Sequence, residues 1–211
     1  MTRLPISILI IAEGYEEEAY LKRVLQFSCF NKEKYVFSVK NANGSGNIAP
    51  KYQDEYSRNK YDLIFVFCDG DNNSKNFKQI VKKICEELFD NYSLKEDIII
   101  FVNPVTLQIV LSHFGDVELR HISKKKNAKD VELLTGVKNY DAKKEQVNAI
   151  VGKIHLNSFE NMMERIEKLS TNIDDTPSTN FGKIIKNYQK ENIDWAEELI
   201  SKINNKNYNN S

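Results

Sequence analysis

The chain has 211 residues, 41% of them hydrophobic, which suits one well-buried domain or one domain with a small addition. Its 30 Lys and Arg residues balance 30 Asp and Glu residues, so no overall field attracts a polyanion and contact with nucleic acid needs a local patch. The apolar run at residues 6–12 is too short to span a membrane, and the amino terminus lacks the cleavage pattern of a signal peptide. Since Cys29, Cys68 and Cys85 have no metal-ligand spacing, we expect a cytoplasmic protein with reduced thiols.

Four short apolar runs predict the strands of a sheet, because each has strand length and ends at turn residues. The segments between them carry apolar residues at helical spacing. This alternation predicts an α/β fold with a parallel sheet, right-handed crossovers and helices on both faces. The predicted strands lie at about residues 6–12, 35–39, 62–68 and 97–102.

Apolar periodicity also predicts seven helices. Glu16, Glu17 and Glu18 lie in the first turn of the first helix, where negative charge complements the helix dipole. Ser74 is a suitable N-cap for the third helix. The predicted helices span residues 16–27, 50–59, 75–89, 106–114, 159–169, 181–188 and 194–203.

We divide the chain into an α/β body, residues 1–114, and a mostly helical C-terminal elaboration of the same domain, residues 115–205. After Gly115 the apolar pattern weakens and the chain becomes most basic, although such charge runs are mostly solvated surface. Residues 206–211 are rich in Asn and are predicted to be disordered. The lysines of the basic region are Lys124, Lys125, Lys126, Lys129, Lys138, Lys143 and Lys144.

Carboxylates follow two of the predicted strands. Glu13 comes directly after the first strand, and Asp69 and Asp71 come after the third. If these strands are neighbours in a parallel sheet, the three side chains converge at one edge, where open α/β sheets keep their chemistry. Three close carboxylates repel one another unless a cation or protons lie among them. The pattern therefore predicts a divalent metal site.

Further motifs stand in a fixed order along the chain. Residues 13–17 read Glu-Gly-Tyr-Glu-Glu and residues 69–71 read Asp-Gly-Asp, a pattern that resembles the EGxxE and DxD motifs of the Toprim domain. Residues 103–114 are similar to the NPxFExWLLLHF segment of the RloB-like, abortive-infection group of Toprim proteins. Residues 177–184 resemble that group's PSTNVxKL segment, and residues 139–143 match a YxK element more weakly. The resemblance spans about residues 8–190.

The resemblance implies a Toprim-like Rossmannoid sheet of about four strands and a metal-dependent nuclease of DNA or RNA, tRNA included, acting in bacterial anti-phage defence. It makes Glu13 a metal ligand or general acid/base, and Asp69 and Asp71 ligands of Mg²⁺ or Mn²⁺. Glu17 becomes the second glutamate of nuclease-type Toprim domains, a further ligand and catalytic residue. His113 is also a catalytic candidate, although a lone histidine near a helix end is more often structural. Hard oxygen ligands suit Mg²⁺, and two such ions would activate water and stabilise the leaving oxygen.

One departure from the family pattern leaves an alternative open. The family's glutamate falls on Leu107, and its aromatic pair falls on Thr106 and Ile109. If that glutamate serves the active site, one acid is lost here. The alternative is a catalytically impaired Toprim module that serves as a binding or sensor subunit of a defence complex.

A third interpretation is a response-regulator-like phosphoacceptor, which also collects acids at strand ends. It needs a lysine after a later strand, where Asn103 and Pro104 stand instead. For the Toprim interpretation, a separate ATPase partner is expected, because effectors of this group work beside an ATPase and the chain contains no GxxxxGK[ST] motif. Whether the chain forms an oligomer stays open.

Overall fold

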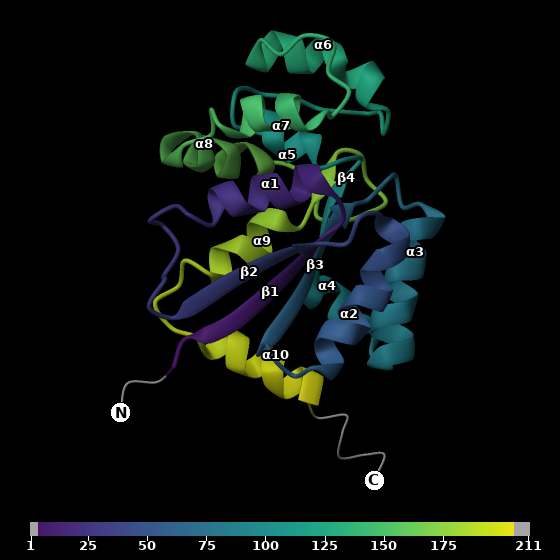
Figure 1. Cartoon of the computed structure of the whole chain (residues 1–211), viewed down its shortest axis with the longest axis vertical. Helices are drawn as coiled ribbons and strands as arrows, with labels where there is room; N and C mark the ends of the chain where they lie inside the picture. The colour runs from purple at the N-terminus through teal and green to yellow at the C-terminus, as the bar shows by residue number, and fades with distance from the viewer. Residues whose placement is uncertain (1–3, 205–211) are drawn as a thin grey trace.

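The computed structural model describes residues 4–204, so the tail predicted at 206–211 lies outside the described residues. Five strands form one sheet in the order β2–β1–β3–β4–β5 (Figure 1). The first four are parallel, and the short β5 pairs antiparallel with β4. The strands are β1 (Ile6–Ala12), β2 (Tyr35–Asn41), β3 (Leu63–Asp69), β4 (Ile99–Asn103) and β5 (Ser178–Thr179).

The prediction of an α/β fold with a parallel sheet is confirmed, and each of the four predicted strands is present to within two residues. β1, β3 and β4 are buried almost throughout because helices cover both faces of the sheet. β5 was not predicted, since a strand of two residues leaves no hydrophobic pattern.

Side chains of β3 alternate between the two faces. Phe67 stacks on Tyr20 of α1 and contacts Phe181 of α9, whereas the carbonyl of Ile64 accepts a hydrogen bond from Tyr52 of α2 on the other face. The helices are α1 (Tyr15–Val24), α2 (Ile48–Ser57), α3 (Lys75–Val81), α4 (Lys95–Ile98), α5 (Leu107–Ser112), α6 (Lys124–Thr135), α7 (Lys144–Val151), α8 (Leu156–Ile166), α9 (Phe181–Asn187) and α10 (Asp194–Asn204).

Each of the seven predicted helices is present, with differences at the ends. The predicted cap of the third helix is confirmed, because Ser74 Oγ accepts a hydrogen bond from the Phe77 N–H. That helix continues from α3 as a π-helix, Lys82–Leu88. The sequence analysis missed α4, α6 and α7, together with two short 3₁₀ turns, Ser45–Asn47 and Tyr92–Leu94.

The C-terminal part of the chain completes the body as well as extending it. β5 and α9 pack on β4, while α6 and α7 lie at the end of the molecule opposite α10 (Figure 1). Within residues 4–204, no helix is both long and apolar enough to cross a membrane.

Candidate metal centre at the carboxyl ends of the strands

Glu13 lies where β1 meets β3. Its backbone N–H donates to the carbonyl of Phe67 at 3.0 Å, and its own carbonyl accepts from Gly44 at 2.8 Å. Its carboxylate oxygen Oε2 accepts a hydrogen bond from the backbone N–H of Asp69 at 3.2 Å. The ends of these two strands therefore bring Glu13 and Asp69 into direct contact, as the parallel pairing required.

Asp69 and Asp71 are held by the loop that follows β4. Asp69 Oδ1 accepts from the N–H of Thr106 at 2.6 Å, and the Asp71 N–H donates to the carbonyl of Pro104 at 3.0 Å. Gly70 lies between them, where a Cβ atom would come within 2.9 Å of Asn103. Only glycine fits this close approach, so the backbone of Asp69–Asp71 is held beside the Asn103–Pro104 step.

Asn103 joins three segments at this point. Its side-chain oxygen accepts from the N–H of Asn72 at 2.7 Å. Its side-chain NH₂ donates to the carbonyls of Ile173 and Asp175, at 3.2 and 2.7 Å, and to Thr176 Oγ1 at 2.9 Å. The C-terminal segment thereby supports the loop that carries Asp71. Asn103 belongs to the segment that resembles NPxFExWLLLHF, but its local sequence indicates no such supporting role.

Asn180, in the segment that resembles PSTNVxKL, plays a similar part beside β4. Its side-chain oxygen accepts from the Phe101 N–H at 2.9 Å, and its NH₂ donates to the Ile99 carbonyl at 2.8 Å. The amide thus pairs with the edge of β4 as the backbone of another strand would. Both asparagines are at most 1% exposed, so their position depends on complete pairing of their polar atoms.

Glu16 and Glu17 add two buried carboxylates from the first turn of α1. Glu17 Oε2 accepts from the N–H of Gly14 at 2.9 Å. Glu16 accepts from Lys124 Nζ at 2.6 Å and from the Tyr140 hydroxyl at 2.7 Å. Sequence reasoning missed Lys124 and Tyr140, which reach the site from more than 100 residues away in the chain. We call Glu13, Glu16, Glu17, Asp69 and Asp71 the acidic rim.

The acidic rim holds more negative than positive charge. Burial raises the pKa of Glu17 to about 7, and the neighbouring Glu16 adds to the effect. Burial also raises the pKa of Asp69 well above its ordinary value, with further contributions from Glu17 and Glu13. The pKa values of Glu13 and Asp71 are raised too, first by burial.

Lys124 is the cation that faces this group. Burial alone lowers the pKa of Lys124, but the attraction of Glu16, followed by that of Glu17 and Asp69, outweighs burial and raises it. One ammonium group cannot neutralise five carboxylates. The remaining acids therefore either keep protons, as their raised pKa values allow, or are balanced by a divalent cation.

The donor set suits Mg²⁺ or Mn²⁺ in kind and in charge. Across residues 4–204, no three acidic, histidine or cysteine side chains converge closely enough to hold a metal ion together. Mg²⁺ needs only one or two carboxylates, however, because it keeps several of its waters. Thr106 Oγ1, on the residue that binds Asp69, is buried without a hydrogen-bond partner among the described residues. Glu13 and Asp69, which are in direct contact, are the pair that would hold the ion, with Asp71 following on the same loop.

His113 lies apart from the acidic rim. It is buried between α5 and α8, where Nε2 contacts the Tyr20 hydroxyl at 3.1 Å and Nδ1 contacts Ser158 Oγ at 3.2 Å. Burial lowers the pKa of His113 to about 3, with a smaller effect from Arg165 in the same direction. A neutral histidine with both ring nitrogens engaged supports the core, so the geometry does not favour the catalytic role considered for it.

Leu107 is the first residue of α5, directly after the residue that binds Asp69. It is 1% exposed and part of the hydrophobic core. The position at which the resembled family carries a glutamate thus contributes only apolar packing here.

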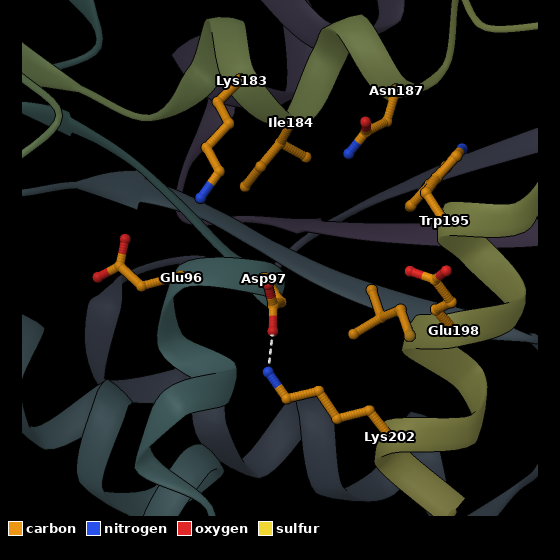
Figure 2. Close-up of a pocket in the computed structure, with 9 residues that line it drawn as sticks. Glu96, Asp97, Lys183, Ile184, Asn187, Trp195, Glu198 and Lys202 are labelled. Atoms are coloured by element: carbon orange, nitrogen blue, oxygen red, sulfur yellow. Dashed lines mark hydrogen bonds and ion pairs between the residues drawn. The ribbon is translucent and has the colours of Figure 1, made fainter.

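A cleft at the opposite end of the sheet has a different character. It has a volume of about 290 Å³ and lies between α4, α9 and α10. Figure 2 shows Lys202 reaching Asp97 across it, with Lys183 and Glu96 nearby. Acids and lysines are mixed in this cleft, and none of its lining residues belongs to the acidic rim.

Comparisons with known proteins assign no function to the chain, so the geometry of the site is the basis for one. No protein-family model, no curated protein and no solved structure matches the chain. The acidic rim is the described site at which buried, mutually repelling groups gather at the carboxyl ends of parallel strands, the edge where open α/β sheets bind their ligands.

Proposed function

We propose that the chain is a Toprim-like nuclease that uses Mg²⁺ or Mn²⁺ to hydrolyse phosphodiester bonds. The observation that carries the proposal is the direct contact between the Glu13 carboxylate and the Asp69 backbone, with Asp71 held on the same loop. The order of the EGxxE-like, DxD-like and PSTN-like segments supports it. So does the part that Asn103 and Asn180 play in supporting the rim.

Each residue of the rim has a separate task in this chemistry. A divalent ion, when bound, would polarise the phosphoryl oxygens and lower the pKa of a water molecule. Asp69 is oriented by the Thr106 N–H, and Glu13 by the Asp69 N–H. Each keeps its second carboxylate oxygen for the ion or its waters. Glu17, with a pKa of about 7, is suited to hold or release a proton near neutral pH.

The resemblance also carries the biological setting that we propose. The protein acts in the cytoplasm as an effector of anti-phage defence, beside a separate ATPase partner that supplies sensing. Co-expression with and without a candidate ATPase partner tests this point. Full protection by this protein alone would contradict it.

The test of the activity uses purified protein with Mg²⁺, Mn²⁺ or EDTA and three labelled substrates, namely single-stranded DNA, duplex DNA and tRNA. We expect metal-dependent cleavage that Glu13→Gln abolishes. The matched control is Glu18→Gln, because Glu18 lies on the same helix but pairs with Lys22 at the surface. Equal cleavage by the wild type and the Glu13 variant would contradict the proposal.

Buried Leu107 favours a second candidate, the catalytically impaired module. We expect Leu107→Glu to place a charge in the core and to lower the unfolding free energy of the metal-free protein by about 1–3 kcal/mol. The uncharged Leu107→Gln is its control. If Mn²⁺ rescues stability and cleavage rises only in the glutamate variant, the wild type lacks a ligand and is the impaired module. If cleavage is unchanged, the nuclease is complete without that acid.

A further inference from the structure

Six exposed lysines lie on α6, on α7 and on the segment between them. None of them forms an ion pair with any residue in the range 4–204. Lys144 lies 5.1 Å from the centre of the Tyr15 ring, next to the first turn of α1. We call the set the α6–α7 lysine surface: Lys125, Lys126, Lys129, Lys138, Lys143 and Lys144.

This surface is locally basic although the chain as a whole is neutral. Residues 124–144 contain seven lysines but only three acids, Asp130, Glu132 and Asp141. Several lysines elsewhere are neutralised instead, as Lys22 is by Glu18 and Lys40 by Glu55, both at 2.6 Å. The positive potential of this surface is therefore not cancelled by its own neighbours.

Two buried contacts fix the surface beside the acidic rim. Lys124, which precedes the first of the six lysines, binds Glu16 at 2.6 Å, and Tyr140 binds the same carboxylate at 2.7 Å. On α7, Asn148 accepts from the Tyr15 hydroxyl at 2.8 Å. Figure 1 shows α6 and α7 above the amino-terminal end of α1. The segment that carries the unpaired lysines thus lies beside Glu16 of the acidic rim.

Fold stability does not explain the placement of these lysines. Lys125 and Lys126 lie in the first turn of α6, which contains no acidic residue. Positive charge there opposes the helix dipole, whereas acidic residues would stabilise the helix. Ser123, at the N-cap position, makes no capping hydrogen bond. Local helix stability therefore does not account for Lys125 and Lys126 at these positions.

We propose that the α6–α7 lysine surface binds the phosphate backbone of a nucleic-acid strand and holds it against the acidic rim. The proposal rests on the proposed nuclease function for the class of its ligand. Lysines act on phosphates as point charges and read no bases. Binding is therefore independent of sequence and falls steeply with salt. The rim itself repels phosphates, so the lysines supply the attraction that brings the strand there.

Fluorescence anisotropy in EDTA measures binding without cleavage. The probes are fluorescein-labelled single-stranded DNA, RNA and duplex DNA, with a labelled polyglutamate peptide as a different polyanion. The test variant combines Lys125→Gln, Lys126→Gln and Lys129→Gln, all at exposed positions. The matched control combines Lys34→Gln, Lys60→Gln and Lys190→Gln, around the amino ends of the strands.

For the test variant, we expect affinity for nucleic acid to fall by about tenfold to a hundredfold near 0.1 M salt. The slope of log affinity against log salt should decrease by about 0.7 to 0.9 for each lysine that contacts a phosphate. The control should bind as the wild type does. Equal binding by all three proteins would overturn the proposal, and so would no binding by the wild type or tighter binding of polyglutamate.

Cleavage assays with metal separate this proposal from the one on which it rests. If the wild type binds through these lysines but never cleaves, the surface stands and the nuclease assignment fails. If the wild type cleaves and the lysine variant binds and cleaves equally well, the nuclease stands and the surface assignment fails.

Discussion

The two ends of the sheet differ in how far their charged groups have local partners. At the amino ends, two acids have local partners: Asp97 pairs with Lys202, and Asp62 accepts hydrogen bonds from the N–H and hydroxyl of Ser7 at 2.7 and 2.6 Å. At the carboxyl ends, buried Glu17 and the neighbouring Asp69 repel each other, and Lys124 is the cation that faces them. A buried, unbalanced charge is destabilising. Because this charge occurs at the carboxyl ends of the strands, we take that end as the candidate site.

The largest expected effect comes from removing charge at the acidic rim. We expect Asp69→Asn to weaken Mn²⁺ binding and any cleavage by more than about 100-fold, because a metal ligand is lost. In EDTA the same variant should unfold at a higher temperature than the wild type, since a buried charge facing Glu17 and Glu13 is gone. Calorimetry and thermal unfolding measure both effects. Lower stability in EDTA would mean that Asp69 is not under charge repulsion.

The next prediction concerns how the unfolding free energy depends on pH, which is set in part by Glu17. Its pKa rises from an ordinary 4.5 to about 7 in the folded protein. Between these pH values the unfolded chain loses a proton that the folded chain keeps, so the unfolding free energy falls as pH rises through this window. Without metal, the fall should be on the order of 3 kcal/mol.

Urea unfolding in EDTA at a series of pH values measures this slope. Glu17→Gln should reduce this slope, because glutamine cannot titrate, while Glu13, Asp69 and Asp71, whose pKa values are also raised, keep part of it. Glu18→Gln is the matched control: burial raises the pKa of Glu18, but its bonds to Lys22 and Asn41 outweigh burial and lower it. The control should keep the downward slope. A flat wild-type profile would remove the contrast between the two ends of the sheet.

The hydrogen bonds of Asn103 that support the rim should affect stability and metal affinity somewhat less than the charges of the rim do. Asn103→Ala removes four hydrogen bonds at a fully buried position, and we expect a loss of about 2–3 kcal/mol in unfolding free energy. Mn²⁺ affinity should fall with it, because the loop that carries Asp71 loses its anchor. Exposed Asn157 on α8 is the control position for alanine. An unchanged Mn²⁺ affinity would separate this support from the site.

The smallest effect is expected at the amino ends. Asp97→Asn breaks a partly exposed ion pair, which should change the unfolding free energy by less than about 1 kcal/mol. Metal affinity and cleavage should not change. A clear loss of metal binding in this variant would mean that the two ends of the sheet are not independent.

Local sequence patterns were sufficient to predict the four parallel strands and to place Glu13 and Asp69 at their ends. Apolar runs of strand length ended directly before Glu13 and Asp69, and parallel pairing then required their side chains to converge. The same reasoning failed for α6, because its buried residues include the polar Asn127 and Thr135. A helix that buries polar residues gives little apolar periodicity.

The partners of Glu16 could not be predicted for a different reason. Glu16 is buried because Lys124 and Tyr140 reach it from residues far along the chain. From the local sequence, Glu16 is only an acid in the first turn of a helix, where its negative charge also complements the helix dipole. The role of Asn103 could not be predicted for the same reason, because its four partners lie in two separate loops.

The bonds of Asn103 and Asn180 set an order of events during synthesis. Every acid of the rim has left the ribosome by the time residue 71 emerges, but the carbonyls and hydroxyl that support Asn103 lie at residues 173–176, and Asn180 comes later still. A nascent chain therefore carries all of its candidate ligands long before it can hold them in place. We expect ribosome-bound chains stalled before residue 170 to bind no Mn²⁺, because they lack the residues that hold Asn103.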